Sequence, residues 1–155
     1  MSQLLVARTE KEIAAEPERV RAFLSDYRNG RPRILPPEYF SDYRVEEGGR
    51  GAGTVIGYRL RAGGRERPYR MRVEEPVAGG EGPIVERDER SSFVTSWALS
   101  ALRGGERTLV TLQSSWEGAG GIGGFFERLF APRALRRIQA DVLAMLQGAI
   151  EEDRP

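Results

Sequence analysis

The sequence contains no cysteine and no histidine, and Lys11 is its only lysine. Disulfides, thiolate nucleophiles and metal sites built from Cys or His are therefore excluded. A catalytic triad with an imidazole base is excluded as well. Any acid–base chemistry must use carboxylates, tyrosine, lysine, arginine or bound water. We expect neither a metal nor a cofactor.

An excess of charge of one sign is also absent, because 24 basic residues stand against 23 acidic ones. Nucleic-acid-binding domains usually carry a basic excess, so we expect no nucleic-acid partner. No apolar run approaches the ~20 residues of a membrane span, and the first residues lack the apolar core of a signal peptide. These features predict a cytoplasmic protein without an integral membrane segment, and they leave any protein partner unknown.

The length and composition are those of one folded domain. The chain has 155 residues, of which 39% are hydrophobic and 30% are charged. Such a length is usual for a single domain, and such a composition is usual for a globular protein. The sequence shows no internal repeat, so we expect residues 1–155 to form one domain.

Much of the chain alternates between apolar and polar residues, which is typical of half-buried strands. Gly63-Gly64 and Gly104-Gly105 are typical of hairpin turns. Two short helices are expected after the first strand, because Pro17 and Pro32 suit the first turn of a helix; the second would end at Leu35. The predicted strands cover residues 5–14, 39–47, 54–62, 66–75, 83–88, 92–102 and 107–117.

The C-terminal segment, Phe125 to Glu152, carries its apolar residues at helical spacing and predicts one long helix. Pro132 is expected to kink or break it, because proline removes a backbone hydrogen bond. The apolar stripe consists of Phe126, Leu129, Phe130, Leu135, Ile138, Val142, Met145, Leu146 and Ala149.

One long helix is too narrow to cover the predicted sheet. Seven strands at ~4.8 Å spacing give a flat width of roughly 34 Å, whereas a helix is ~10–12 Å across. We therefore predict an α+β fold in which a strongly curved antiparallel sheet of about seven strands surrounds the C-terminal helix. The short helices would close one end, and the space inside would either hold a ligand or be filled by side chains.

Large side chains on the inner face of the sheet are candidates to line a cavity. Small-molecule sites are commonly apolar and aromatic with a few polar anchors. An ordinary packed core is the alternative, and for the phenylalanines of the last helix an apolar gate and plain helix packing are both open. The predicted ligand-binding residues are Leu35, Tyr58, Tyr69, Met71, Thr95, Trp97, Ser114, Trp116, Phe126 and Phe130.

A glycine-rich stretch, residues 118–123, has the spacing G-x-G-x-x-G between a strand and a helix. A dinucleotide site would need a further strand with an acidic residue ~20 positions later. The helix is the last predicted element, so no such unit forms. No Gly-Lys-Ser/Thr follows either, so a phosphate-binding loop is excluded. We interpret the stretch as a hinge at the mouth of the cavity or as a simple turn.

Lys11 and a group of arginines on the last helix could each have a functional role or simply be solvent-exposed. By alternation Lys11 lies on the inner face of the first strand, where a lysine could act as a base or hold an anion, although lysines near strand ends usually reach solvent. The arginines on the last helix could meet an acidic partner or anionic lipid, but a solvated helix face is the simpler interpretation. That group is Arg128, Arg133, Arg136 and Arg137.

The order of elements resembles the helix-grip fold of the START-like (SRPBCC) superfamily. Local signals agree with it: Glu12-Ile13-Ala14-Ala15 before Pro17, Leu24-Ser25-Asp26, and Gly51-Ala52-Gly53-Thr54. Trp116-Glu117-Gly118 followed by Glu127-Arg128-Leu129 is similar to the polyketide cyclase/dehydrase-like branch. The resemblance covers nearly the whole chain and implies a ligand cavity, whereas no catalytic motif matches residue by residue.

Three functions are open from the sequence. The first is binding of a small hydrophobic or aromatic molecule such as a lipid, a quinone or a polyketide-like compound. The second is a cyclase, dehydratase or aromatase acting in the same cavity, with Tyr58, Tyr69 or Lys11 assisting proton transfer. The third is an interaction protein with a filled core and a docking face of arginines. The sequence itself does not decide whether the protein is an enzyme.

Overall fold

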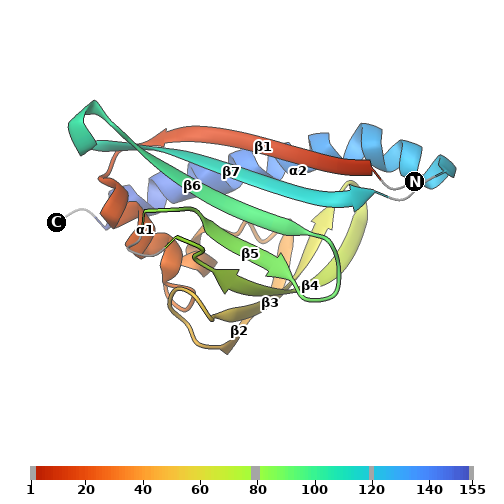
Figure 1. Cartoon of the computed structure of the whole chain (residues 1–155), viewed down its shortest axis with the longest axis horizontal. Helices are drawn as coiled ribbons and strands as arrows, with labels where there is room; N and C mark the ends of the chain where they lie inside the picture. Colours follow the sequence, from red (N-terminus) through yellow and green to blue (C-terminus); the bar gives the residue numbers. More distant parts are fainter. Residues whose placement is uncertain (1–2, 78–80, 119–120, 154–155) are drawn as a thin grey trace.

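The computed structural model describes residues 3–77, 81–118 and 121–153, with side chains except at 3 and 121–130. Strands form most of the first three quarters of the chain, and one long helix forms the rest (Figure 1). The elements are β1 (Gln3–Ile13), α1 (Pro17–Ser25), η1 (Arg31–Ile34), β2 (Phe40–Glu47), β3 (Val55–Ala62), β4 (Arg65–Glu74), β5 (Ile84–Asp88), β6 (Val94–Leu102), η2 (Arg103–Gly105), β7 (Arg107–Gly118) and α2 (Gly121–Glu152).

The seven strands form one antiparallel sheet in the order β1-β7-β6-β5-β4-β3-β2. Neighbours from β2 to β7 follow one another in sequence, so most connections are hairpins. Helices α1 and η1 lie in the connection between β1 and β2, which form the two edges of the sheet. The register places Ser114 of β7 opposite both Ala7 of β1 and Thr95 of β6, so these residues share one face.

Helix α2 covers one face of the sheet and lies behind it in Figure 1. It contacts β1, β7, β3 and η1. Gln139 accepts a hydrogen bond from the Thr9 hydroxyl at 2.9 Å and donates one to the Ala7 carbonyl at 3.0 Å. The Gln147 side chain accepts one from the Ala14 amide at 2.9 Å. These bonds fix the position of α2 along β1.

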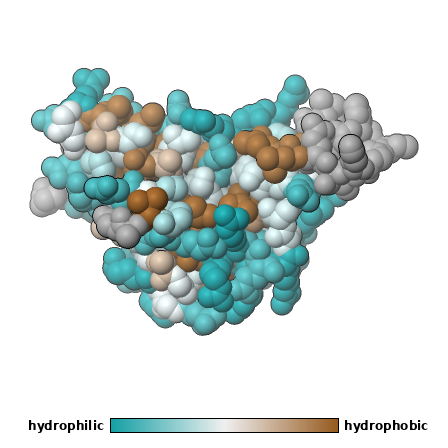
Figure 2. All heavy atoms as spheres, in the orientation of Figure 1, coloured by the Kyte–Doolittle hydropathy of each residue, from teal (hydrophilic) through white to brown (hydrophobic). Residues whose placement is uncertain are grey.

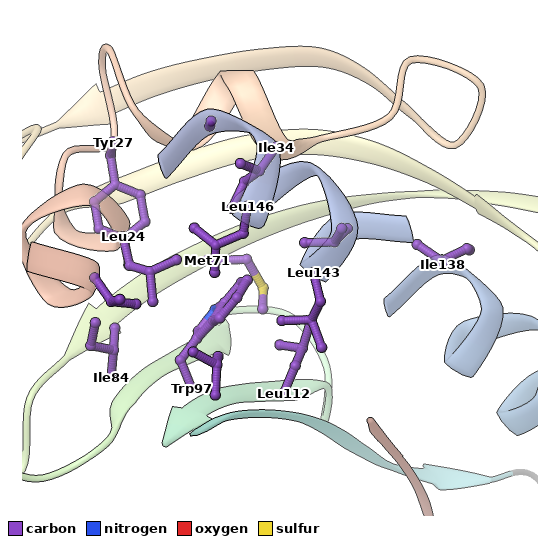
Figure 3. Packing of buried hydrophobic residues seen from close by; sticks show 14 of the residues in the cluster. Leu24, Tyr27, Ile34, Met71, Ile84, Trp97, Leu112, Ile138, Leu143 and Leu146 are labelled. Atoms are coloured by element: carbon purple, nitrogen blue, oxygen red, sulfur yellow. The ribbon is translucent and has the colours of Figure 1, made fainter. Parts of the chain in front are cut away.

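The core lies between α2 and the sheet, and α1 and η1 close one end of it. Figure 3 shows Trp97 and Leu112 of the sheet together with Leu143 and Leu146 of α2. Burial of each such side chain contributes about 1.5–3 kcal/mol to folding. The helix supplies Leu135, Ile138, Val142, Leu143, Leu146, Ala149 and Ile150 to this core.

The predicted α+β class, the seven strands and the long C-terminal helix are confirmed. The strong curvature of the sheet stays a prediction. Helix α2 begins at Gly121, four residues before the predicted start at Phe125. The sequence prediction missed this first turn because glycine is a poor helix former and carries no apolar pattern. Of the predicted kink or break at Pro132, the break is wrong, since α2 continues through this residue, and the kink stays a prediction. Proline removes only one hydrogen bond, and the packed turns that follow hold the helix together.

The described part of the chain exposes few large apolar side chains. In Figure 2 hydrophobic residues are scattered among hydrophilic ones over β1, β7 and β6. The exposed large hydrophobic side chains among those described are Leu4, Val6 and Val77. Scattered apolar residues of this kind are usual on protein surfaces. No helix in the described part of the chain has both the length and the apolar character needed to span a bilayer.

Candidate functional site: two adjoining cavities under the sheet

The larger of two neighbouring hollows, here the outer cavity, has a volume of about 410 Å³. It lies where the β3–β4 hairpin, the start of β6 and the end of β7 approach α2. Charged and hydroxyl side chains contribute to its lining, while aromatic and aliphatic side chains form the rest. Its lining is Leu60, Ala62, Gly63, Arg65, Arg67, Tyr69, Ser91, Ser92, Phe93, Trp116, Glu117, Ala131 and Leu135.

The inner cavity is smaller, about 60 Å³, and lies deeper in the core. Leu60, Phe93 and Leu135 line both cavities, so the two adjoin at these three side chains. We call these three residues the neck. The full inner lining is Arg31, Leu35, Phe40, Ile56, Tyr58, Leu60, Glu86, Phe93, Thr95, Trp97, Leu112, Ser114, Leu135, Ile138, Gln139 and Val142.

Five aromatic rings form a continuous row beside both cavities. The ring centroids of Phe40 and Tyr58 are 5.4 Å apart, and those of Tyr58 and Tyr69 are 5.8 Å apart. The row continues from Tyr69 to Phe93 at 4.7 Å and from Phe93 to Trp116 at 6.1 Å. Such distances are typical of favourable ring contacts. The aromatic row therefore extends from the inner cavity, lined by Phe40, Tyr58 and Phe93, to the outer cavity, lined by Tyr69, Phe93 and Trp116.

A buried ion pair forms the floor of the inner cavity. Arg31 and Glu86 are only 2% and 3% exposed, and Arg31 Nη1 lies 2.6 Å from Glu86 Oε2. The Tyr27 hydroxyl donates to the same oxygen at 2.6 Å, and Arg31 Nη2 donates to the Leu24 carbonyl at 2.9 Å. The guanidinium also lies 4.5 Å from the Tyr27 ring centroid and 4.8 Å from that of Trp97. This packing holds a charged arginine inside the core.

The protonation states of the floor follow from burial and from the ion pair. Burial alone would lower the pKa of Arg31, but the adjacent Glu86 carboxylate outweighs it and raises that pKa above its usual value. Burial raises the pKa of Tyr27 and of Tyr58 well above the usual range for a phenol. At neutral pH the inner cavity is therefore lined by a charged arginine and the protonated Tyr58, and Tyr27, which bonds to Glu86, is protonated as well.

The remaining polar groups of the inner cavity pair mostly with each other. The Thr95 and Ser114 hydroxyls lie 2.8 Å apart across β6 and β7. Gln139 is held by β1, as described above. The Tyr58 hydroxyl forms no hydrogen bond with a described residue. Among the described side chains, no group of three carboxylates is placed to hold a metal ion.

Residues 5–151 match the protein family described as polyketide cyclase/dehydrase and lipid transport. The chain belongs to this family. The match spans every element from β1 to α2, so the cavities lie entirely within the family's domain. No protein with curated annotation matches the chain closely.

Known structures agree with this assignment. The KanY protein, determined in solution by NMR, is 41% identical over 96% of this chain and 99% of its own, with a TM-score of 0.82. The Zhui aromatase/cyclase from Streptomyces sp. R1128 has a TM-score of 0.75 at 18% identity, covering 97% of this chain and 95% of its own. A START superfamily protein from Mycobacterium smegmatis has a TM-score of 0.67 at 13% identity, covering 95% of this chain and 97% of its own. The last two show a shared fold.

Most predicted ligand-binding residues of this family member line one of the two cavities. Leu35, Tyr58, Thr95, Trp97 and Ser114 line the inner cavity, and Tyr69 and Trp116 line the outer one. Their contact with a ligand stays a prediction. Met71 lines neither cavity; it is fully buried and lies among the core side chains of Figure 3. Phe126 and Phe130 belong to α2, but their side chains lie outside the described part of the chain, as do those of Phe125 and Leu129.

The other sequence candidates lie away from the floor of the cavities. Lys11 is exposed and lines neither cavity, as expected for a lysine that reaches solvent. Arg133, Arg136 and Arg137 are exposed on α2, whereas the side chain of Arg128 is outside the described part. In the glycine-rich stretch, Gly118 ends β7 and residues 121–123 already belong to α2; residues 119 and 120 are not described.

Sequence reasoning missed the ion pair on the floor. Arg31 and Glu86 lie 55 positions apart, and arginine is rarely buried, so no local pattern joins them. A weak signal was present in β5, where Ile84, Glu86 and Asp88 alternate with Val85 and Arg87. Glu86 shares a face with Ile84, and an acidic residue at an inward position requires a buried partner.

Proposed function

We propose that this protein binds a small hydrophobic molecule with an aromatic or conjugated body in the two cavities between the sheet and α2. The outer cavity carries this proposal, because its volume of about 410 Å³ lies within the ~300–1,000 Å³ of small-molecule sites. The aromatic row runs beside this space, and most polar groups farther inside pair with each other. The family description, which names lipid transport as well as cyclases, supports the same class of guest.

Native mass spectrometry of gently purified protein, with solvent extraction, tests the proposal. We expect a bound small molecule, or at least thermal stabilisation by members of a panel of lipids, quinones and polycyclic aromatics. A protein that carries nothing and responds to no compound of the panel would contradict it.

A variant of the neck links binding to the cavities. Leu135 is 7% exposed and lines both of them, so Leu135→Trp fills the space between them. We expect binding to weaken at least about tenfold, because the guest loses the volume it occupies. Arg136→Trp places the same ring on the exposed side of α2 and is the control. Circular dichroism checks folding, and Leu60→Phe is a milder neck variant. Unchanged binding in both folded neck variants would contradict the proposed location.

A cyclase, dehydratase or aromatase activity is the second candidate. It is supported by the Tyr58 hydroxyl, which stays protonated at neutral pH and lines the inner cavity together with Arg31 and Glu86. A protonated phenol can donate a hydrogen bond to a substrate oxygen and stabilise negative charge that develops on it. Lys11, being exposed and outside both cavities, has no part in this candidate. Unchanged turnover of a poly-β-keto substrate by Tyr58→Phe would rule out the assigned role.

A further inference from the structure

Two buried hydrogen-bond donors of the inner cavity lack an acceptor. Arg31 Nε and Trp97 Nε1 are the buried side-chain nitrogen or oxygen atoms without a hydrogen-bond partner in the described part of the chain. Both residues line the inner cavity, and they are 2% and 3% exposed. They also adjoin each other, since the guanidinium carbon lies 4.8 Å from the Trp97 ring centroid. An unsatisfied buried donor costs about 1–3 kcal/mol, so two of them on neighbouring residues need an explanation.

None of the polar groups nearby in the described part of the chain accepts a hydrogen bond from either donor. Both hydrogen bonds that Glu86 accepts from described residues end on Oε2, from Arg31 Nη1 and from Tyr27. Thr95 and Ser114 bond to each other. The unmet demand on the floor is therefore for an acceptor for the N–H groups of two neighbouring residues, one of them charged.

We propose that the floor of the inner cavity binds an oxygen atom of the guest, a carbonyl or phenolic oxygen, through Arg31 Nε and Trp97 Nε1. This inference rests on the proposed function and adds an orientation to it: the oxygen end enters first. The rest of the guest lies along the aromatic row and fills the outer cavity. The inner cavity, at about 60 Å³, has room for a head group of a few atoms but not for a ring system.

The two unpaired donors exclude the other head groups. A cationic head such as an ammonium brings donors and no acceptor, so it would leave Arg31 Nε and Trp97 Nε1 unpaired. A hydrocarbon head would leave both donors without an acceptor and would bear their desolvation cost. An oxygen acceptor satisfies both donors, and a hydrogen bond from a charged donor is the stronger kind.

The test uses two probes of the same shape, acetonaphthone and its hydrocarbon counterpart isopropenylnaphthalene, which differ in a carbonyl oxygen against a methylene group. Affinities are measured by isothermal titration or ligand fluorescence. We expect the ketone to bind wild-type protein at least about tenfold more tightly than the olefin. Trp97→Phe keeps a ring against Arg31 but removes the indole N–H. Its affinity for the ketone should be about three- to tenfold weaker than that of the wild type, and its affinity for the olefin should be unchanged.

An NMR readout on the wild type is independent of any variant. The chain has two tryptophans, so a proton–nitrogen correlation spectrum shows two indole signals, which Trp116→Phe distinguishes. We expect the ketone to move the Trp97 signal downfield and the olefin to leave it nearly in place. If Trp97→Phe does not fold, this measurement decides.

The outcomes separate the two proposals. If both probes bind equally and the Trp97 signal stays in place, the cavity binds aromatic guests but the oxygen site is wrong, and the two donors are served by water alone. If neither probe binds and the wider panel also fails, the proposed function and the oxygen site are both overturned.

Discussion

Removal of the Glu86 charge should destabilise the fold more than any comparable change at a surface ion pair. Glu86→Gln keeps the size of the side chain but leaves the Arg31 guanidinium charged and buried without its carboxylate. Arg31 and Glu86 are almost fully buried, so solvent does not screen their interaction. The Tyr27 hydroxyl loses a charged acceptor at the same time.

The expected cost follows from these contacts. Loss of one partner from a buried ion pair costs about 3–5 kcal/mol, because an uncompensated charge remains in the core. A chain of this kind is stable by about 5–15 kcal/mol in total. Glu86→Gln should therefore remove a large part of the free energy of unfolding. The retained amide oxygen can still accept neutral hydrogen bonds, which places the expected value near the lower end.

Urea denaturation followed by circular dichroism measures the effect. The matched control is Glu152→Gln, which removes a carboxylate 3.1 Å from Arg33 but at a side chain that is 76% exposed. Exposed pairs contribute about 0–1 kcal/mol, so the control should stay close to wild type. If Glu86→Gln were to lose less than about 1 kcal/mol, the reasoning about the floor would be refuted.

Two further predictions concern the surface and the backbone. Arg70 donates a hydrogen bond to Glu46 at 2.5 Å and lowers the pKa of that carboxyl below its usual 4.5. A carboxyl with a lowered pKa stabilises the fold above its unfolded pKa and loses this effect as the pH falls. The melting temperature of Arg70→Met should thus differ most from wild type near neutrality and least below pH 4.5, whereas Arg67→Met should show no such trend. In unfolding titrations Gly148→Ala should raise the free energy of unfolding by up to about 1 kcal/mol, because the added Cβ in α2 meets open space. Gly30→Ala should lower it by about 1–3 kcal/mol, because the added Cβ would lie 2.6 Å from a backbone oxygen of α1. Changes of the opposite sign would contradict the local geometry.

The fold could be predicted because its signals are local and repeat along the chain. Alternation in residues 54–62 and 107–117 and the helical stripe of the last segment are each readable within one element. Element ends were less certain for the same reason. Helix α2 starts in glycines that carry no apolar pattern, and Pro132 has the same local signature whether a helix breaks or continues.

The candidate site was predictable only in part. Alternation identified Tyr58, Trp97 and Ser114 as inward residues, and all three line the inner cavity. The same rule selected Met71, although an inward position does not distinguish a cavity wall from a packed core. Arg31 was out of reach, because its burial depends on Glu86 and Trp97 in distant strands, and pairing of this kind leaves no trace in spacing.

The neck separates residues that contribute to the stability of the fold from residues that do so little. In the proposed site, side chains of the floor would both recognise a guest and hold the core together, so substitutions there would change selectivity only at a cost in folding free energy. The outer cavity has exposed residues such as Arg65 and Arg67 in its lining, and these contribute little to the packing of the core. Under this proposal, substitutions at the rim would change which guest is accepted with little loss of stability, whereas substitutions at the innermost contact would change both.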